Sequence, residues 1–278
     1  MDVLGCLGIL LMTATGCMAT ELEIDADVGA EDLGSGAGAL VSMNALSFNA
    51  LSFNALSFNA LSFNALSFNA LESEATSALQ DPGEGGDLFR TLVRYTVSCA
   101  LTGTQSFSFS WTDGAGTTHE EVYPGQLGLA AAWGEGALDA VGKQMVSACL
   151  AARTNRYGVS VVISMRSHEK PLRHDVAEDE LDAYAHVEGA FWGNLFAETP
   201  CLRACYHEPS VPVARSAQRD CAAGQLDGAG GIEDCGMIEI VGSCQDLCGG
   251  LHPPGQYYKD CDDPDSGRTR NVVTTALE

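Results

Sequence analysis

"ALDAVGKQMVSACLAARTNRYGVSVVISMR", from Ala137 to Arg166, is the stretch that decides the fold class. Its first half predicts a helix because apolar and small side chains recur at helical spacing. These side chains belong to Leu138, Val141, Met145, Cys149 and Ala152. The second half begins at Tyr157 and is a short apolar run rich in β-branched residues, as in a buried strand. A helix that leads directly into a buried strand predicts that both element types share one core.

The segment "DLFRTLVRYTVSCAL", residues 87–101, also has the spacing of a helix with one apolar face. That face consists of Leu88, Leu92, Tyr95 and Cys99. Asp87 stands where an N-cap is expected, because its carboxylate can accept a hydrogen bond from the first helical turn. The many β-branched residues of the segment leave a strand as the alternative.

A hairpin is predicted next. "QSFSFSW", residues 105–111, alternates polar and apolar side chains, which indicates a half-buried strand. The turn Asp113-Gly114 follows, and "TTHEEVYPG", residues 117–125, is the candidate partner strand.

Further along the chain the pattern is less regular. Residues 157–166, 236–242 and 271–277 have the composition of strands, residues 168–182 that of a loop or short helix, and residues 183–196 stay ambiguous. We therefore predict an α+β fold with two helices packed on a small, mostly antiparallel sheet. A disulfide-rich C-terminal region and a disordered N-terminal tail complete it.

The charge is strongly negative and unevenly distributed. The 278 residues include 37 acidic and 14 basic side chains, and no lysine or arginine precedes Arg90. Such a chain repels phosphate backbones, so nucleic acid is not an expected partner. Acidic surfaces commonly keep a secreted protein soluble.

The N-terminus has the features of an export signal. "VLGCLGILLMTATGC", residues 3–17, is an apolar run of signal-peptide length and too short to span a bilayer. In one interpretation the chain is cleaved before Cys17 and lipidated on its sulfur, because "ATGC" resembles a bacterial lipobox in which Ala14 replaces the usual Leu. In the other, cleavage follows Ala19. The opening Met1-Asp2 lacks a basic n-region, so either the true start lies upstream or the export signal is weaker.

Eleven cysteines agree with export, because disulfides persist in oxidising compartments. Cys6 belongs to the signal and Cys17 is the candidate lipidation site. Nine cysteines remain, so at most four intramolecular disulfides form and one thiol is left over, with a connectivity that the spacing does not fix. The candidates for disulfide bonding are Cys99, Cys149, Cys205, Cys221, Cys235, Cys244, Cys248 and Cys261.

A perfect repeat of "NALSF" runs from Asn44 and ends at Leu71. A period of five fits neither a helical stripe nor a strand face, and so few copies cannot close a solenoid core. Two interpretations remain: a spacer produced by slippage in the gene, or an apolar segment that adds to a sheet edge or self-associates. The chain thus divides into five segments. They are a signal peptide (1–19), an acidic disordered tail (20–43), the repeat (44–71), a Pro/Gly/acid linker (72–86) and a Cys-rich globular domain (87–278).

Several quoted motifs together carry a resemblance. "LVRYTVSCAL", "GQLGLAAAW", "VSACLAARTNRYGVSVVISMR", "EGAFWGNLF" and "CGMIEIVGSCQDLC" occur in this order. Over residues 44–278 the chain resembles an uncharacterised family of bacterial exported proteins and lipoproteins with short Asn-Gly-Leu or Asn-Ala-Leu repeats before a Cys-rich domain. The resemblance implies export and no particular activity. It also implies a bond between Cys99 and Cys149, and marks Cys201 as the addition that makes the cysteine count odd.

Several cysteines and histidines are candidates for a metal or catalytic site, but none of them completes a known motif. Cys201-x-x-x-Cys205 and Cys244-x-x-x-Cys248 have a permitted zinc spacing, although disulfide bonding is the stronger interpretation. Histidines in "HEE" (119–121) and "HEK" (168–170) lack the second His of a metalloprotease helix. His168, His174 and His207 could converge with a carboxylate on a metal or act as acid and base.

Two acidic clusters are candidate calcium sites, although neither fits the EF-hand register. The first is Asp227, Glu233 and Asp234; the second is Asp260, Asp262, Asp263 and Asp265. Solvated turns are the alternative. The aromatic side chains of Tyr184, Phe191, Trp192 and Phe196 belong either to a core or to a surface for a peptide or sugar.

No catalytic residue and no cofactor is assigned from the sequence. The predicted function is that of an exported, lipid-anchored, non-enzymatic envelope or surface protein. The membrane is its partner through the lipid, and a protein or carbohydrate ligand is unidentified. The competing prediction is a secreted hydrolase or metal-binding protein that uses the histidines and carboxylates of the C-terminal domain.

Overall fold

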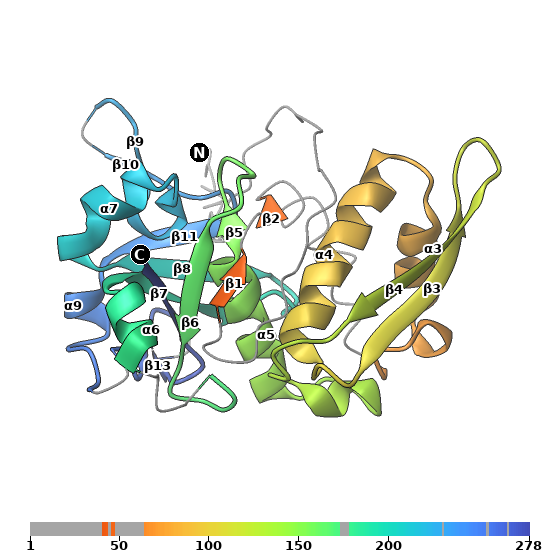
Figure 1. Ribbon diagram of the computed structural model, residues 1–278, viewed down its shortest axis with the longest axis horizontal. Coiled ribbons are helices and arrows are strands. Elements are labelled where there is room, and N and C mark those ends of the chain that lie inside the picture. Colours follow the sequence, from red (N-terminus) through yellow and green to blue (C-terminus); the bar gives the residue numbers. More distant parts are fainter. Residues whose placement is uncertain are drawn as a thin grey trace, which may run out of the picture.

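The computed structural model describes residues 41–43, 46–47, 64–172, 178–229, 231–253, 256–265 and 267–278. The predicted signal peptide, Cys17 and most of the predicted acidic tail lie outside the described residues. Figure 1 shows the arrangement of the elements along the chain.

A six-stranded sheet, in the order β1-β6-β14-β7-β8-β11, is the centre of the fold. Its strands are β1 (Val41–Met43), β6 (Val162–Arg166), β7 (His186–Asn194), β8 (Cys201–Tyr206), β11 (Ile238–Ser243) and β14 (Val273–Leu277). Neighbouring strands are antiparallel except β8 and β11, which are parallel. A parallel pair needs a crossover connection. The short helices η4 (Glu208–Ser210), α7 (Val211–Ser216) and α8 (Asp220–Ala223) lie in it. The predicted α+β class with a mostly antiparallel sheet is confirmed.

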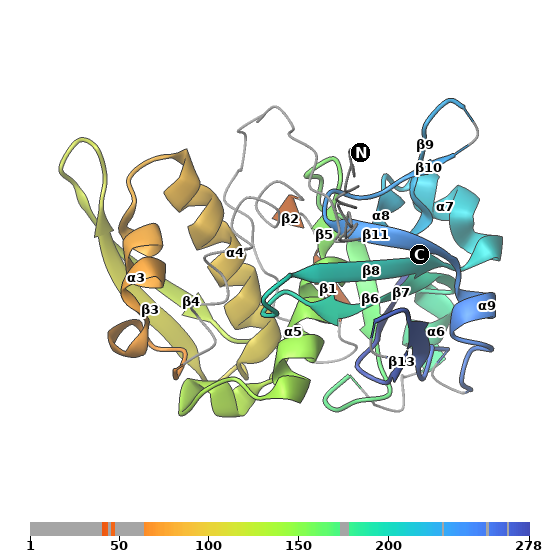
Figure 2. The same cartoon turned by 180° about the vertical axis from the view of Figure 1, so that it is seen from behind.

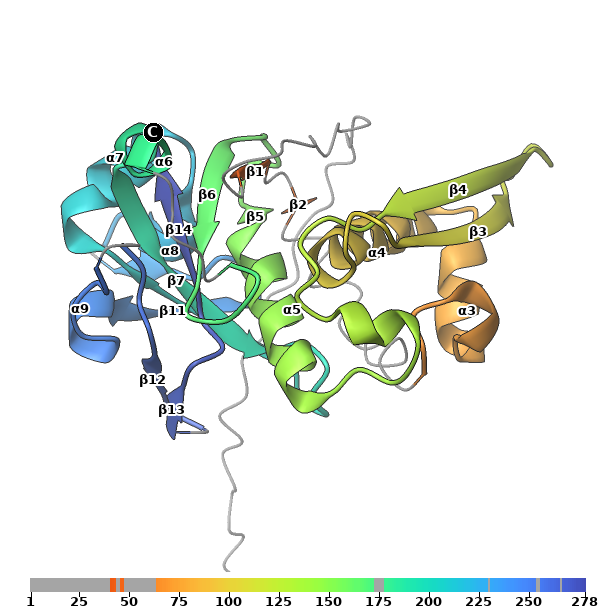
Figure 3. The same ribbon diagram turned by 60° about the horizontal axis from the view of Figure 1, so that its bottom comes forward.

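Alternate residues of the sheet enter two different cores. Phe191 of β7 and Leu202 of β8 point to a large apolar cluster, and we call this side the helix face. Trp192 and Cys205, one and three residues further along the chain, belong to a second, smaller cluster on the other side, the disulfide face. Figure 3 shows α5 on one side of the strands and α9, β12 and β13 on the other.

Two long helices build the helix face. Helix α5 (Ala140–Ala152) packs on β7, β8 and β14, and α4 (Glu84–Ala100) packs on α5. The Asp139 carboxylate caps α5 by accepting a 2.7 Å bond from the Gly142 N–H. Both predicted helices are therefore present, with two corrections. Val141 is 53% exposed rather than buried, and α4 begins three residues before the expected N-cap Asp87.

The predicted hairpin is β3 (Ser106–Thr112) and β4 (Thr118–Pro124). Asp113 fixes its turn by accepting bonds from the N–H groups of Ala115 and Thr117, at 2.9 and 2.8 Å. Alternation buries Phe107 and Phe109. Figure 2 shows α4 between this hairpin and α5.

The segment predicted as a linker (72–86) is folded. It contains helix α3 (Ser73–Gln80), whose Ala75 and Leu79 are buried against the core. The Arg90 guanidinium of α4 donates to the carbonyl oxygens of Leu79 and Asp81, at 2.8 and 2.7 Å. Two apolar side chains four positions apart are enough to attach this short helix, although Gly, Pro and acidic residues dominate the surrounding composition.

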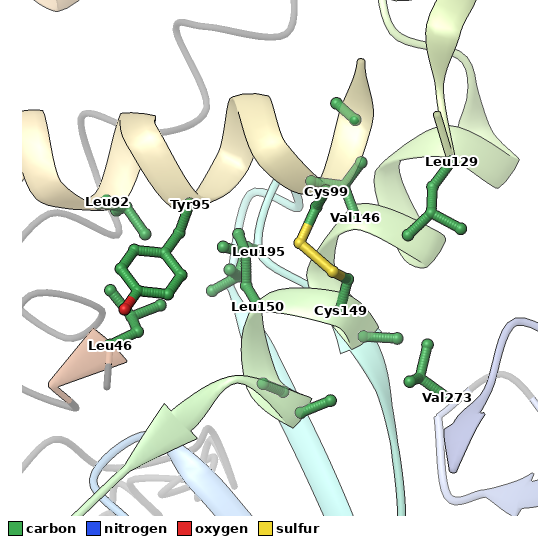
Figure 4. Packing of buried hydrophobic residues seen from close by; sticks show 14 of the residues in the cluster. Leu46, Leu92, Tyr95, Cys99, Leu129, Val146, Cys149, Leu150, Leu195 and Val273 are labelled. Carbon is green, nitrogen blue, oxygen red and sulfur yellow. A yellow bond between two sulfur atoms is a disulfide. The ribbon is translucent and has the colours of Figure 1, made fainter. Parts of the chain in front are cut away.

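The repeat is part of the fold wherever it is described. In the first copy, β2 (Leu46–Ser47) pairs with β5 (Thr154–Asn155), and Leu46 is fully buried beside Tyr95 (Figure 4). In the fifth copy the Asn64 carbonyl accepts a bond from the Trp133 indole at 3.1 Å, and the Leu66 N–H donates to the Trp133 carbonyl at 2.7 Å.

A short helix η2 (Phe68–Ala70) ends the described repeat. Strand β1, which precedes the repeat, is already paired with β6. The interpretation of the repeat as a spacer in front of the domain is therefore wrong for the described copies, because Leu46 and Leu66 are buried in the core and Leu71 packs against it.

The remaining elements are short. They are η3 (Ala131–Gly134), α6 (Glu178–Ala183), β9 (Gln225–Leu226), β10 (Ile232–Glu233), α9 (Cys244–Leu247), β12 (Cys261–Asp263) and β13 (Gly267–Thr269). None of the helices in the described part of the chain combines the length and the apolar composition needed to cross a membrane.

Candidate functional site

Four disulfides are the main covalent feature of the chain. They join Cys99 to Cys149, Cys205 to Cys244, Cys221 to Cys235, and Cys248 to Cys261. All eight candidate cysteines are used, and Cys201 lies outside the four bonds. The bond between Cys99 and Cys149, which the resemblance implied, connects α4 to α5 (Figure 4).

Two of these disulfides lie against each other on the disulfide face. The Sγ atoms of Cys205 and Cys248, which belong to different disulfides, are 3.5 Å apart. The Sγ atoms of Cys205, Cys248 and Cys261 all lie within 4.8 Å of one another. We call Cys205, Cys244, Cys248 and Cys261 the sulfur cluster. The thiolate set predicted from spacing differs from it, because Cys201 is not a member and Cys261 is.

His207 follows Cys205 by two residues and contacts Tyr258 and Gln245. Its Nδ1 is 2.7 Å from the Tyr258 hydroxyl and 3.0 Å from the Gln245 side-chain nitrogen. Both partners can donate, so Nδ1 is the acceptor of the neutral ring. Burial lowers the pKa of His207 and raises the pKa of Tyr258. The ring is thus kept neutral and fixed in orientation.

The other histidines have different surroundings. The His168 ring contacts the Arg270 guanidinium and lies 6.4 Å from the Tyr257 ring, and His174 is outside the described residues. His119 stacks on Trp111 and pairs with Asp113 at 2.9 Å. Among the described residues the sulfur cluster supplies the one group of three potential metal ligands. The hypothesised convergence of His168 and His207 on a metal is therefore not seen there.

Arginines occupy the second acidic cluster. The Arg268 guanidinium pairs with Asp260 and, at 2.7 Å, with Asp262. Arg203 pairs with Asp263 at 2.7 Å and with Asp265 at 2.6 Å. Each of the four carboxylates is thus paired with a guanidinium group, and Arg203 also pairs with Glu239 at 3.2 Å. The cluster forms two arginine clamps, and the calcium site stays a prediction.

The first acidic cluster is also structural. Asp227 closes a turn by accepting bonds from the N–H groups of Ala229 and Gly231, at 2.7 and 2.8 Å. Glu233 pairs with Arg156 at 2.8 Å, and Asp234 accepts a bond from the Ile240 N–H at 2.8 Å. The three carboxylates are held by separate partners.

The aromatic cluster belongs to the core. Tyr184, Phe191, Trp192 and Phe196 are all buried. The Trp192 indole donates to Asp263 at 2.9 Å, which ties β7 to the Arg203 clamp. These side chains offer no surface to a peptide or sugar.

A buried charge pair, which the sequence did not reveal, crosses the helix face. Glu188 of β7 and Arg219 are both fully buried and pair at 2.9 Å. Arg219 also donates to the carbonyl oxygens of Ala152 and Thr154, at 2.9 and 2.6 Å, and the Thr275 hydroxyl donates to Glu188 at 2.8 Å. Burial raises the pKa of Glu188, against the opposing effect of Arg219.

This pair joins the end of α5 and strand β5 to the middle of the sheet. The Glu188 Oε1 and Asp220 Oδ1 atoms are buried without a hydrogen-bond partner among the described residues.

One feature of the sequence could have revealed the buried pair. Glu188 lies inside "HVEGAFW", a run whose other side chains suit a buried strand. A charge in such a run implies a buried partner of opposite sign.

Comparisons with protein-family models, with curated proteins and with solved structures find no match. Membership of the exported family therefore stays a prediction.

Proposed function

We propose that the chain is an exported, lipid-anchored, non-enzymatic envelope or surface protein whose disulfide-stabilised domain binds a protein or carbohydrate partner. The observation that carries the proposal is the set of four disulfides, which uses all eight candidate cysteines. Such a set is typical of oxidising compartments outside the cytosol. The net charge of −23 argues against a nucleic-acid partner.

The anchor proposed here is Cys17, and the position of β1 limits its tether. Strand β1 begins at Val41 and pairs with β6, so the domain starts before the repeat. Residues 18–40 then connect lipid and domain. At no more than ~3.5 Å per residue these 23 residues reach about 80 Å. The described copies of the repeat, with Leu46 and Leu66 buried, contribute to the domain rather than to its distance from the membrane.

Support for a non-enzymatic role comes from the bonds of the residues that suggested catalysis. His207 accepts bonds from Tyr258 and Gln245, and the carboxylates of the second acidic cluster are paired with Arg203 and Arg268. The competing prediction of a secreted hydrolase would need these groups to leave their partners.

The intact mass of the native protein, alkylated without reduction, tests the proposal. We expect a product that begins at Cys17, carries a diacylglycerol and accepts at most one alkyl group on a thiol. The matched Cys17→Ala variant should lose the lipid mass and leave the membrane fraction. A full-length wild-type product with nine or more alkylated cysteines would contradict export and anchoring together.

A further inference from the structure

The sulfur cluster brings four sulfur atoms from two disulfides into one buried volume. Within the disulfides the sulfur atoms are 2.08 Å apart for Cys205–Cys244 and 1.96 Å apart for Cys248–Cys261. Between the disulfides, Cys205 Sγ and Cys248 Sγ are 3.5 Å apart. The other two disulfides belong to the large cluster of the helix face, so this juxtaposition is a feature of the disulfide face.

We propose that the four cysteines of the sulfur cluster, when reduced, form a tetrahedral zinc site. The residues would hold either two disulfides or one Zn²⁺ ion. This site is separate from the proposed anchoring function and does not depend on it.

The separations suit a four-thiolate site. Zinc–sulfur bonds of about 2.3 Å in a tetrahedron place neighbouring sulfur atoms about 3.8 Å apart. Cys205, Cys248 and Cys261 Sγ atoms already lie within 4.8 Å of one another. Cys244 Sγ is not in this group of three, but its 2.08 Å bond to Cys205 Sγ places it next to the group. After reduction, rotation of the Cys244 side chain would have to bring the fourth sulfur atom to the ion.

The ligands come from elements that hold them in place. Cys205 lies on β8, and Cys261 begins β12. Cys244 begins helix α9 and Cys248 is its C-cap, so one helical turn separates the two. Three residues between them fall within the usual range for a pair of zinc ligands.

The surroundings favour a closed, structural site. All four cysteines are buried, and the same cluster contains Trp192, Tyr258 and Val272. Apolar walls exclude water and competing ligands, which is the arrangement of structural rather than catalytic zinc. Cys201, at the other end of β8, is not in this group.

The chemistry balances with a dithiol as reductant. Each of the two disulfides takes up two electrons and two protons, and each dithiol becomes a disulfide. Zn²⁺ then binds the four thiols and displaces their four protons, because the ligands are thiolates. The metal would connect β8, α9 and β12 as the two disulfides do in the oxidised chain. Reduction in the presence of zinc would therefore leave the disulfide face closed.

The test uses the full chain, reduced anaerobically with a phosphine, which offers no thiolates to the metal. Each phosphine is oxidised to its oxide with an oxygen atom from water while one disulfide gains two electrons and two protons. We expect one Zn²⁺ per reduced chain by elemental analysis. Co²⁺ in place of zinc should give the visible bands of a tetrahedral ion and a strong thiolate-to-metal charge-transfer band. The oxidised chain should bind neither ion.

Single variants decide where the ion is held. Cys205→Ser, Cys244→Ser, Cys248→Ser and Cys261→Ser should each lose the four-thiolate Co²⁺ spectrum. The matched variants Cys99→Ser, Cys221→Ser and Cys201→Ser should keep it. Absence of stoichiometric binding in the reduced wild type would overturn the proposal. So would equal effects of both sets of variants, because an unfolded reduced chain would use all its cysteines alike.

Discussion

The helix face of the sheet is covered by α5, on which α4 packs, and by the short helices α7 and α8. Helices α5 and α4 are 13 and 17 residues long. The disulfide face is covered by α9, with four residues, and by β12 and β13, with three residues each. The helices supply continuous apolar surfaces, and the large cluster on their side consists mainly of aliphatic and aromatic side chains. Both clusters contain four half-cystines, but on the disulfide face these are four of only eleven buried residues.

This difference shows how one sheet can be stabilised in two ways. A long helix buries enough apolar surface to offset the cost of ordering it, since each buried aliphatic side chain contributes about 1.5–3 kcal/mol. Elements of three or four residues cannot do so, because they have few side chains to bury against the same cost per residue. Disulfides stabilise such segments by restricting the unfolded chain instead.

Removal of single disulfides tests this comparison most severely. Cys205–Cys244 and Cys99–Cys149 close segments of 39 and 50 residues, so chain entropy alone predicts a similar loss of about 4 kcal/mol for each. We expect a loss of about 5 kcal/mol for Cys205→Ala/Cys244→Ala. For Cys99→Ala/Cys149→Ala we expect about 3 kcal/mol, because the apolar contact of α4 with α5 remains.

The measurement is guanidinium unfolding without reductant, followed by tryptophan fluorescence, with both double variants at the same protein concentration. Equal losses in the two variants would mean that the packing on the two faces contributes equally, and the comparison would be wrong.

The buried pair of Glu188 and Arg219 is the exception on the helix face, because it is ionic. Arg219→Met should lower the free energy of unfolding by about 3–5 kcal/mol at pH 7, since it leaves a buried carboxylate without its counter-charge. Glu188→Met/Arg219→Met should recover part of that loss, because two apolar side chains replace the pair.

The loss in Arg219→Met should also depend on pH. Burial raises the pKa of Glu188 above its ordinary value of 4.5, so the folded state binds a proton that the unfolded state releases. The contribution of the Glu188 carboxyl group to the free energy of unfolding is then largest below about pH 4.5 and falls as the pH rises. Urea unfolding of both variants at pH 4 and pH 7 should show a smaller loss for Arg219→Met at pH 4. The same loss at both values would contradict a buried, charged Glu188.

The repeat gives a third test, because its described leucines belong to the helix-face cluster. Leu46→Ala and Leu66→Ala should each cost about 2–4 kcal/mol, as other buried leucines do. Ser67→Ala, in the same copy as Leu66, is the control and should change stability by less than about 0.5 kcal/mol because its side chain is exposed. Thermal unfolding of the three variants measures this. Unchanged stability in both leucine variants would restore the interpretation of the repeat as a spacer.

Much of the helix face could be predicted from the sequence. The apolar spacing of α5 and the alternation of β3 depend on neighbours in the chain, and both elements formed where the pattern placed them. Strand β8 was missed because it begins at Cys201 in a segment whose cysteines and prolines indicate loops. Helix α3 was missed because two buried side chains outweigh an unfavourable composition.

The sites were harder to predict, because their partners are distant in the chain. Arg203 meets Asp263 across 60 residues, and Cys205 meets Cys244 across 39. The spacing predicted that Cys201 and Cys205 belong to one set of four thiolates. In the structure the sulfur cluster contains Cys261 instead of Cys201. The acidic clusters could be located from the sequence, but not the arginines and backbone N–H groups that pair with their carboxylates.

The smallest expected effect lies at the outer edge of the disulfide face. Arg268 pairs with Asp260 and Asp262, but its side chain is 51% exposed. Water and salt weaken such a pair, so Arg268→Gln should cost no more than about 1 kcal/mol and the difference from wild type should disappear in 1 M salt. Chemical unfolding by urea at low and high salt measures it, with Lys259→Gln as a control for the loss of one positive charge. A loss above about 2 kcal/mol that persists in salt would mean that ion pairs, and not the two disulfides, hold β12 and β13 against the sheet.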